Sequence, residues 1–497
     1  RDRDVTGVQT CALPISSRGK SYFTYGRIVY KPPAHKLRGR VHINREASFT
    51  YGEAGLPGLI EMSRLSHIPL QDISRLSPGS AISAMQVNEA VRSGHLIRWK
   101  KNLPEGFKTA GALIACDRGG FIYEPRVGLH DDVWEVDFFS LYPSIMVRHN
   151  ISPETLNCAC CPRSPLIVPE IGYRICEKRT GLIPRVLEPI LNRRRVYKSM
   201  KDDPRKGANY QLRAKALKWV LVTCFGYTGY RNARFGRIEC HESITAYGRD
   251  ILVRSARIAE SRGFEVLHGI VDSLWLHGGG DIHRLCDEIS AEFGIPLNIE
   301  GRYRWIVFLP SVSTGVGALN RYYGLFDDGE LKLRGIAARR RDAPAIVEEL
   351  QQEMLQCLSQ AGNAQEFIDT VPEALLVMDD YAAELRGGGV AAERLIVRKR
   401  ISRRLEEHTR FNDPVAALRQ LHDRGFELEP GQSVEYVILD SGSGRSWDRV
   451  RAAPFLADDG YDREKYVELV HRGAAELLSP FGWSFQRIRG RDGSQRR

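Results

Sequence analysis

The feature that most constrains how this chain can fold is a lone carboxylate in an apolar stretch. Asp272 lies inside the run Gly269–Leu276, which otherwise reads as an apolar hairpin of two strands. A carboxylate between valine and leucine is costly to bury unless a cation meets it. The hairpin therefore predicts either a cation-binding position or, as the plainer alternative, an ordinary turn residue.

A second acid of this kind ends another predicted strand far upstream. The alternating apolar stretch Val133–Asp137 leads into a tight turn that carries an aromatic residue and a proline. Two acids far apart in sequence are what a two-metal phosphoryl-transfer site requires, because one ion activates the attacking hydroxyl and both neutralise the phosphate. Mg²⁺ prefers oxygen ligands and retains several waters, so two carboxylates and the substrate phosphates would suffice to hold two ions.

Two long helical patterns between these acids supply positive charge. They cover residues 184–200 and 209–223, and the short turn between them, with Pro204 and Gly207, predicts an antiparallel helical hairpin. Basic residues crowd both helices: Arg193, Arg194, Arg195, Lys198, Lys201, Arg213, Lys215 and Lys218. Facing cations on two helices would clamp a triphosphate. The alternative is a solvated basic face.

The net charge indicates a polyanionic partner. Lys and Arg number 72 against 61 Asp and Glu, which gives +11 at pH 7, and each cation laid on a phosphate releases condensed counterions. Ten cysteines in 497 residues do not form a dense disulfide framework. The sequence has no apolar run long enough to span a bilayer. We therefore expect a reduced, cytoplasmic and nucleoid-associated protein that does not bind a membrane.

Four of the cysteines lie close together in the sequence. Cys158, Cys161 and Cys176 could bind Zn²⁺, with Cys160 or His149 as the fourth ligand. The spacing of these residues is irregular. The alternative is a set of separate reduced cysteines.

Several motifs resemble, in the same order, those of archaeal family B DNA polymerases. The first is Asp137 with Ser140–Ile145 and Arg148–Leu156. The second is Arg213–Tyr230, and the third is Asp272 with Ser273. Downstream come Arg321-Tyr322, Gly324, Arg334-Gly335 and Arg340–Asp342, and then thumb-like segments at 395–399, 461–462 and 480–483. The resemblance covers most of the chain from Leu59 onward.

The resemblance implies a role for each matched position. Asp137 and Asp272 would bind two Mg²⁺ ions together with the carbonyl of Phe138, and Lys218 would assist catalysis. Tyr142 would pack under the nucleotide sugar and exclude a 2′-hydroxyl. Nucleotide binding would involve Ser140, Leu141, Tyr142, Arg193, Lys218 and Phe225. The residues expected to contact primer–template DNA are Arg321, Tyr322, Arg334, Gly335, Arg340 and Arg341. These contacts would position the DNA without reading its sequence.

The resemblance also implies an α/β chain of the α+β type with right-hand polymerase architecture. A palm of antiparallel sheet and helices, helical-hairpin fingers, a mostly helical thumb and a remnant exonuclease-like region are expected. The boundaries would be 1–16 for a non-native leader, 17–109 for the N-terminal remnant, 110–178 and 233–345 for the palm, 179–232 for the fingers and 346–497 for the thumb. Expected partners are primer–template DNA, deoxynucleoside triphosphates and replication accessory proteins.

Some positions depart from the family pattern. Ile270 stands where the third motif usually has its first acid, Val222-Thr223 replace an Asn-Ser pair, and Phe225 replaces a tyrosine. Gly55 stands where a proofreading exonuclease motif would have an acid. We therefore expect slow, low-fidelity or damage-tolerant synthesis without 3′–5′ proofreading. The alternative is an inactive relative that binds primer–template as a replication scaffold.

Overall fold

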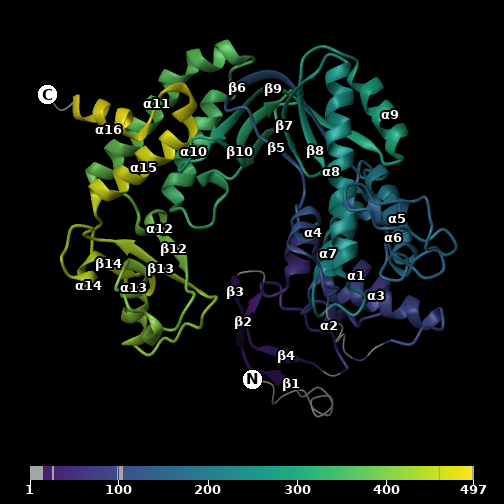
Figure 1. Cartoon of the computed structure of the whole chain (residues 1–497). Coiled ribbons are helices and arrows are strands. Elements are labelled where there is room, and N and C mark those ends of the chain that lie inside the picture. The colour runs from purple at the N-terminus through teal and green to yellow at the C-terminus, as the bar shows by residue number, and fades with distance from the viewer. Residues whose placement is uncertain are drawn as a thin grey trace. The chain divides into compact units, whose positions relative to one another are not determined.

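The computed structural model describes residues 15–24, 27–37, 39–97, 99, 105–457 and 459–494. The leader expected at 1–16 therefore lies outside the described residues, apart from its last two positions. Helices and antiparallel strands follow one another along the chain, which confirms the α+β class (Figure 1). The chain divides into two compact units. The first contains Ala34–Tyr123 and Glu135–Glu300, and the second contains Arg18–Pro33, Glu124–Trp134 and Gly301–Arg497.

An antiparallel sheet in the first unit presents the turn that carries Asp272. Its strands, in spatial order, are the end of β6 (Gly128–Phe138, of which Glu135–Phe138 belong to this unit), β8 (Ser273–His277), β7 (Glu265–Ile270) and β5 (Ile122–Tyr123). β7 and β8 form the predicted hairpin, in which Ile270 pairs with Ser273. Consecutive residues of both strands are buried, so both faces are covered, which explains why the hairpin reads as a continuous apolar run.

The predicted helical hairpin is also present in the first unit. α6 (Leu182–Ser199) and α7 (Gly207–Gly229) pack along each other, and each begins two residues before its predicted start. α1 (Phe49–Ser66) and α3 (Pro78–Arg92) pack against α7 (Figure 1). Gly58 permits the close approach of α1, because a β-carbon there would lie 3.0 Å from the carbonyl oxygen of Leu212.

The remaining elements of the first unit surround this framework. α8 (Ile238–Ser261) packs on β7, on α7 and on the short α5 (Leu141–Arg148) that follows Asp137. The others are β1 (Ile15–Ser17), β4 (Ala34–Lys36), α2 (Leu70–Ile73), α4 (Ala110–Cys116) and α9 (Ile282–Phe293). α5 therefore joins the end of β6 to the segment that leads into α6.

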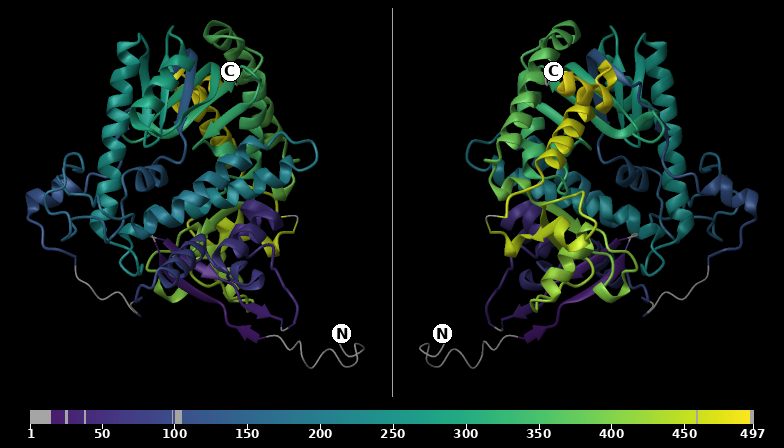
Figure 2. Two further views of the ribbon diagram at one scale, coloured as in Figure 1. Left: turned by 90° about the vertical axis from the view of Figure 1, so that its right-hand side faces the viewer. Right: turned by 90° about the vertical axis from the view of Figure 1, so that its left-hand side faces the viewer.

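The second unit has its own core. It contains β9 (Leu297–Pro310) from Gly301 onward, the first four residues of that strand belonging to the first unit. β9, β10 (Gly317–Phe326) and β11 (Leu331–Arg334) form antiparallel pairs. Trp305, Tyr323 and Phe367 are fully buried among the helices α10 (Ala345–Leu358), α11 (Ala364–Gly387) and α15 (Arg463–Leu478), which pack side by side (Figure 2). β13 (Ser433–Ile438) lies between β12 (Val397–Arg400) and β14 (Val450–Ala452) in a three-stranded sheet. Smaller elements are β2 (Lys20–Thr24), β3 (Arg27–Lys31), α12 (Ala392–Leu395), α13 (Asp413–His422), α14 (Ser446–Arg449) and α16 (Phe485–Ser494). Among the described residues of both units, no helix is long and apolar enough to cross a bilayer.

Candidate active site

The two acids singled out in the sequence meet where β6 ends and the β7–β8 hairpin turns. The backbone N–H of Phe138 donates a hydrogen bond of 2.8 Å to the carbonyl oxygen of Asp272. The Ser273 hydroxyl donates to Oδ2 of Asp137 over 2.9 Å. Val271, the other turn residue, has a positive φ of 55°, which is rare and strained for a β-branched side chain. Pairing between the strands thus holds both carboxyls at one point.

Both carboxyls are electrostatically unfavourable in the absence of a cation. Burial, and then repulsion from Asp272, raises the pKa of Asp137 to about 7. Burial also raises the pKa of Asp272, although Lys218 opposes that shift. A third acid, Glu300 of β9, raises the pKa of both. Converging carboxylates that repel one another form an all-oxygen donor set, which fits a hard divalent cation such as Mg²⁺.

A pH-dependent loss of stability follows from these shifts. A carboxyl whose pKa is raised in the folded state stabilises the fold below its ordinary pKa, and this contribution is lost as pH rises through the folded-state value. Between pH 4 and about 7, the Asp137 carboxyl therefore lowers the stability of the metal-free chain progressively. Mg²⁺ should restore this lost stability at pH 8, and we expect it to raise Tm by roughly 2–4 °C for each kcal/mol of unfolding free energy that it restores. Thermal melts of the wild type and Asp137→Asn across this range measure the effect; equal pH slopes and equal responses to Mg²⁺ would contradict it.

A cavity of about 490 Å³ opens beside the acids. Three acids and three cations line it: Asp137, Asp272, Glu300, Arg194, Lys198 and Lys218. The rest of its wall is Phe139, Ser140, Leu141, Tyr142, Pro143, Leu221, Val222, Phe225 and Val271. The sequence thus identified the two acids, Lys218, Tyr142 and Phe225, and the fold brings all of them into one cavity.

The cations of α6 divide between two faces of the helix. Nη1 of Arg194 donates to the Ser140 hydroxyl over 2.8 Å, and its guanidinium lies 4.9 Å from the centre of the Phe139 ring. Lys198, one turn further along, lies over the same ring at 5.8 Å. Arg193 lies elsewhere, because it forms an ion pair of 3.0 Å with the buried Glu61 of α1. In this structure Arg193 therefore does not line the cavity, whereas Arg194 and Lys198 do.

Aromatic rings form another part of the cavity wall and continue into a stack with His241. The rings of Tyr142 and Phe225 have centroids 4.3 Å apart, and Phe225 stacks in turn on His241 at 4.3 Å. A β-carbon on Gly248 would lie 2.8 Å from the Tyr142 ring, so this glycine allows α8 to approach the ring closely. Burial raises the pKa of Tyr142 to about 12, which keeps its hydroxyl neutral. The Tyr142 ring is thus held from several sides.

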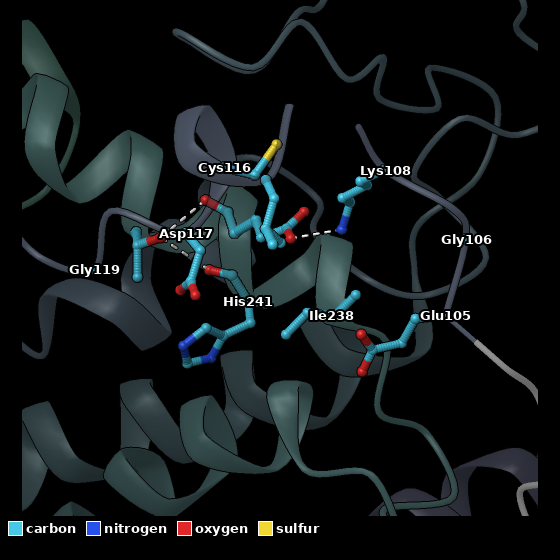
Figure 3. Close-up of a pocket in the computed structure, with 11 residues that line it drawn as sticks. Glu105, Gly106, Lys108, Cys116, Asp117, Gly119, Ile238 and His241 are labelled. Carbon is cyan, nitrogen blue, oxygen red and sulfur yellow. Dashed lines mark hydrogen bonds and ion pairs between the residues drawn. The ribbon is translucent and has the colours of Figure 1, made fainter. Parts of the chain in front are cut away.

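A second cavity of about 270 Å³ adjoins the stack at His241 (Figure 3). Nζ of Lys108 forms an ion pair of 2.6 Å with Glu242, which also accepts a hydrogen bond of 2.9 Å from the Tyr173 hydroxyl. Burial lowers the pKa of His241, so its ring is neutral at pH 7. The ion pair and the hydrogen bond brace α8 directly behind the aromatic wall.

The residues expected to contact DNA all belong to the second unit, and they divide into two groups. The Arg334, Arg340 and Arg341 side chains are exposed, and Gly335 adopts a positive φ of 65° in contact with the backbone of Asn320. Arg321 is engaged internally, with Nη2 2.6 Å from Glu476 of α15. Tyr322 is only 4% exposed, and its ring packs against Phe308. The ring of Tyr322 is therefore buried in this conformation, and its contact with DNA stays a prediction.

Arg194 and Lys198 belong to the basic set that the sequence predicts would clamp a triphosphate, and their spacing by four positions places them on one face of α6. Glu300 is the cavity residue that the sequence prediction did not include. Glu300 gives no comparable local signal, because it stands in a mixed polar and apolar strand.

Comparisons with known proteins agree with the geometry. Residues 105–275 match the family model described as DNA polymerase family B. The chain is 29% identical over 462 residues to DNA polymerase 2 of Aeropyrum pernix, with 91% of this chain and 54% of that protein covered. It is 30% identical over 460 residues to the DNA polymerase of Thermococcus sp. (strain 9oN-7), with 89% and 57% covered. The family B DNA polymerase structure from Pyrobaculum calidifontis matches with a TM-score of 0.64 at 27% identity, over 85% of this chain and 53% of that one. The chain thus spans about half the length of the relatives it matches, and its resemblance to archaeal family B DNA polymerases is confirmed.

Proposed function

From the resemblance of this chain to archaeal family B DNA polymerases, we propose that it adds deoxynucleotides to the 3′ end of a primer under the direction of a template. The observation that carries this proposal is the convergence of Asp137 and Asp272 in a cavity that three cations also line. Phosphoryl transfer requires mainly positioning and charge neutralisation, which such a set of side chains can provide.

Asp137, Asp272 and the carbonyl of Phe138 would hold two Mg²⁺ ions. When bound, the ions would lower the pKa of the primer 3′-hydroxyl and neutralise charge on the transferred phosphate. The hydrogen bond from Ser273 orients the Asp137 carboxyl. Glu300 adds negative charge to the same site, which strengthens the attraction of a divalent cation.

The nucleotide would lie between the cations and the aromatic wall. Lys218, Arg194 and Lys198 would bind the triphosphate, since charge-assisted hydrogen bonds to phosphate are strong. Tyr142 would pack under the sugar, and Phe225 would stack near the nascent base pair. The close packing of Gly248, Phe225 and Tyr142 supports a fixed ring that leaves no room for a 2′-hydroxyl.

Substitution of two neighbouring arginines separates an effect on nucleotide binding from an effect on the stability of the fold. We expect Arg194→Ala to raise the KM for deoxynucleotides by roughly 10–100-fold, because a charge-assisted hydrogen bond contributes about 1.5–3 kcal/mol. Arg193→Ala should lower Tm, because it leaves the buried carboxyl of Glu61 without its ion pair, and should leave KM unchanged. Steady-state kinetics and thermal melts of both variants test this. A larger KM effect for Arg193→Ala than for Arg194→Ala would contradict the assignment.

Primer extension by the full chain tests the proposed activity. The wild type should extend a primer with Mg²⁺ and the four deoxynucleoside triphosphates. Ile270 and Val222 favour a second candidate, a scaffold that binds primer–template without synthesis. Retained binding of primer–template with no extension under either Mg²⁺ or Mn²⁺ would establish that scaffold and exclude the polymerase.

We further propose that this chain has no 3′–5′ proofreading activity of its own and copies with low fidelity or tolerates damage. Gly55 supports the first point, because it lies at the kink of α1 with a φ of 58° and offers no carboxylate. Val222 lines the nucleotide cavity and supports the second. Accessory proteins and an association with the nucleoid are expected of a replication enzyme. Degradation of a mismatched 3′ end by the purified chain would contradict the proofreading proposal.

A further inference from the structure

A compact cluster of four sulfurs lies in the segment that joins α5 to α6, outside the site described above. The Sγ atom of Cys160 lies 3.4 Å from that of Cys158, 3.6 Å from that of Cys176 and 3.8 Å from that of Cys161. The sulfurs of Cys161 and Cys176 are also 3.8 Å apart, and all four lie within 4.8 Å of one another. These thiols are not joined in disulfides.

The sulfur separations match the coordination shell of a single metal ion. Zn²⁺ binds thiolate at about 2.3 Å in a tetrahedron, which places neighbouring sulfurs about 3.8 Å apart. A disulfide would require about 2.05 Å between two of them. Four sulfurs this close enclose one ion and leave no room for a cluster of several irons, and an all-sulfur tetrahedral set selects Zn²⁺ among the divalent metals that cells supply.

The backbone fixes the sulfurs from both ends of the segment. The N–H of Cys176 donates to the carbonyl of Thr155 over 2.8 Å, and Leu156 forms a β-bridge with Ile175. His149, the other candidate for the fourth ligand, stacks on Tyr247 at 3.8 Å instead. Cys160 therefore completes the set.

We propose that Cys158, Cys160, Cys161 and Cys176 bind one structural Zn²⁺ ion. Three of the four side chains are buried and only Cys160 is exposed, which suits a closed structural site rather than a catalytic one with an open position. Zinc binding at this site does not require polymerase activity, so the zinc proposal and the proposed function are tested independently.

The ion would brace the beginning of α6, which carries Arg194 and Lys198 to the nucleotide cavity. The side-chain amide of Asn150 donates to the carbonyls of Cys176 and Arg179 over 3.1 Å and 2.9 Å, and its oxygen accepts from the N–H of Gly181 over 2.7 Å. The carboxylate of Glu154 accepts from the first amide of α6 over 2.5 Å. The cysteine segment and the base of α6 thus form one hydrogen-bonded unit.

Metal analysis of the full chain, purified under reducing conditions, tests the proposal. We expect one zinc per chain by elemental mass spectrometry. Cys161→Ser and Cys176→Ser should lose it, whereas Cys357→Ser, at a half-buried cysteine outside the cluster, should retain it. Co²⁺ added to the apo chain should give the visible absorption of a tetrahedral thiolate site. Removal of zinc by a chelator should lower Tm by roughly 5–15 °C, and added Zn²⁺ should restore it.

Three outcomes would overturn the proposal, and none of them requires a variant to fold. The first is wild-type chain that contains no zinc and gives no thiolate absorption with Co²⁺. The second is a disulfide between two of the four cysteines that persists in protein purified under reducing conditions. The third is iron with sulfide in place of zinc, which would show a multinuclear cluster.

Discussion

Asp137→Asn is expected to slow primer extension by at least roughly 10³-fold, because the loss of one metal-binding carboxylate removes several kcal/mol of transition-state stabilisation. The fold should survive, since Asn preserves the shape of the side chain and removes the repulsion that raises the pKa of Asp137. Single-turnover extension with saturating primer–template measures the loss, and a binding assay shows whether the DNA is still held.

A matched control variant separates the general loss of one negative charge from the loss of a metal-binding carboxylate. Asp287→Asn, at an exposed position on α9, removes one carboxylate from the same unit and should extend at the wild-type rate. Asp272→Asn should resemble Asp137→Asn, and the double variant should be little worse than either, because the two acids act as one unit. A rate within tenfold of wild type for Asp137→Asn would refute the catalytic role.

Tyr142→Ala is expected to reduce the preference for deoxynucleotides over ribonucleotides by on the order of 10²-fold, the scale on which a pocket discriminates a single added group. The ring is held against Phe225 and Gly248, so it cannot move aside for a 2′-hydroxyl, and its removal opens that space. The ratio of kcat/KM for the two nucleotide classes measures the effect.

Tyr142→Phe is the control for this prediction. It keeps the ring and removes only the hydroxyl, so discrimination should remain close to that of the wild type. Tyr142→Ala also leaves a void in the aromatic wall, which should lower Tm, and kinetics are therefore compared well below the Tm of the variant. Unchanged sugar discrimination in a folded Tyr142→Ala chain would remove the role assigned to the ring.

Features that depend on local patterns could be predicted from the sequence. The helical hairpin follows from periodicity and from the turn at Pro204 and Gly207, and the β7–β8 hairpin follows from a bounded apolar run. Asp272 stood out because it is a lone acid in an apolar run, and Asp137 because it ends an alternating strand at a tight turn. Glu300 could not be found in this way, because only the pairing of distant strands brings β9 to the same site.

A resemblance does not give the direction of a side chain, because packing against distant residues determines it. Successive residues of a strand face opposite sides, so Arg321 and Tyr322 of β10 cannot both face one partner. Arg321 reaches Glu476, and Tyr322 packs on Phe308. The choice between Arg193 and Arg194 likewise depends on Glu61 of α1, which is distant in the sequence.

Asp137 and Asp272 are proposed to hold two divalent cations together beside a bound nucleotide. Electron paramagnetic resonance can count bound Mn²⁺ on the full chain with primer–template and an unreactive deoxynucleotide analogue, and the cysteine cluster would not interfere, because thiolates disfavour Mn²⁺. Two tightly bound ions in the wild type, lost in Asp137→Asn and retained in Asp287→Asn, are the predicted result. Mn²⁺ binding that is absent in the wild type, or identical in all three proteins, would contradict the account.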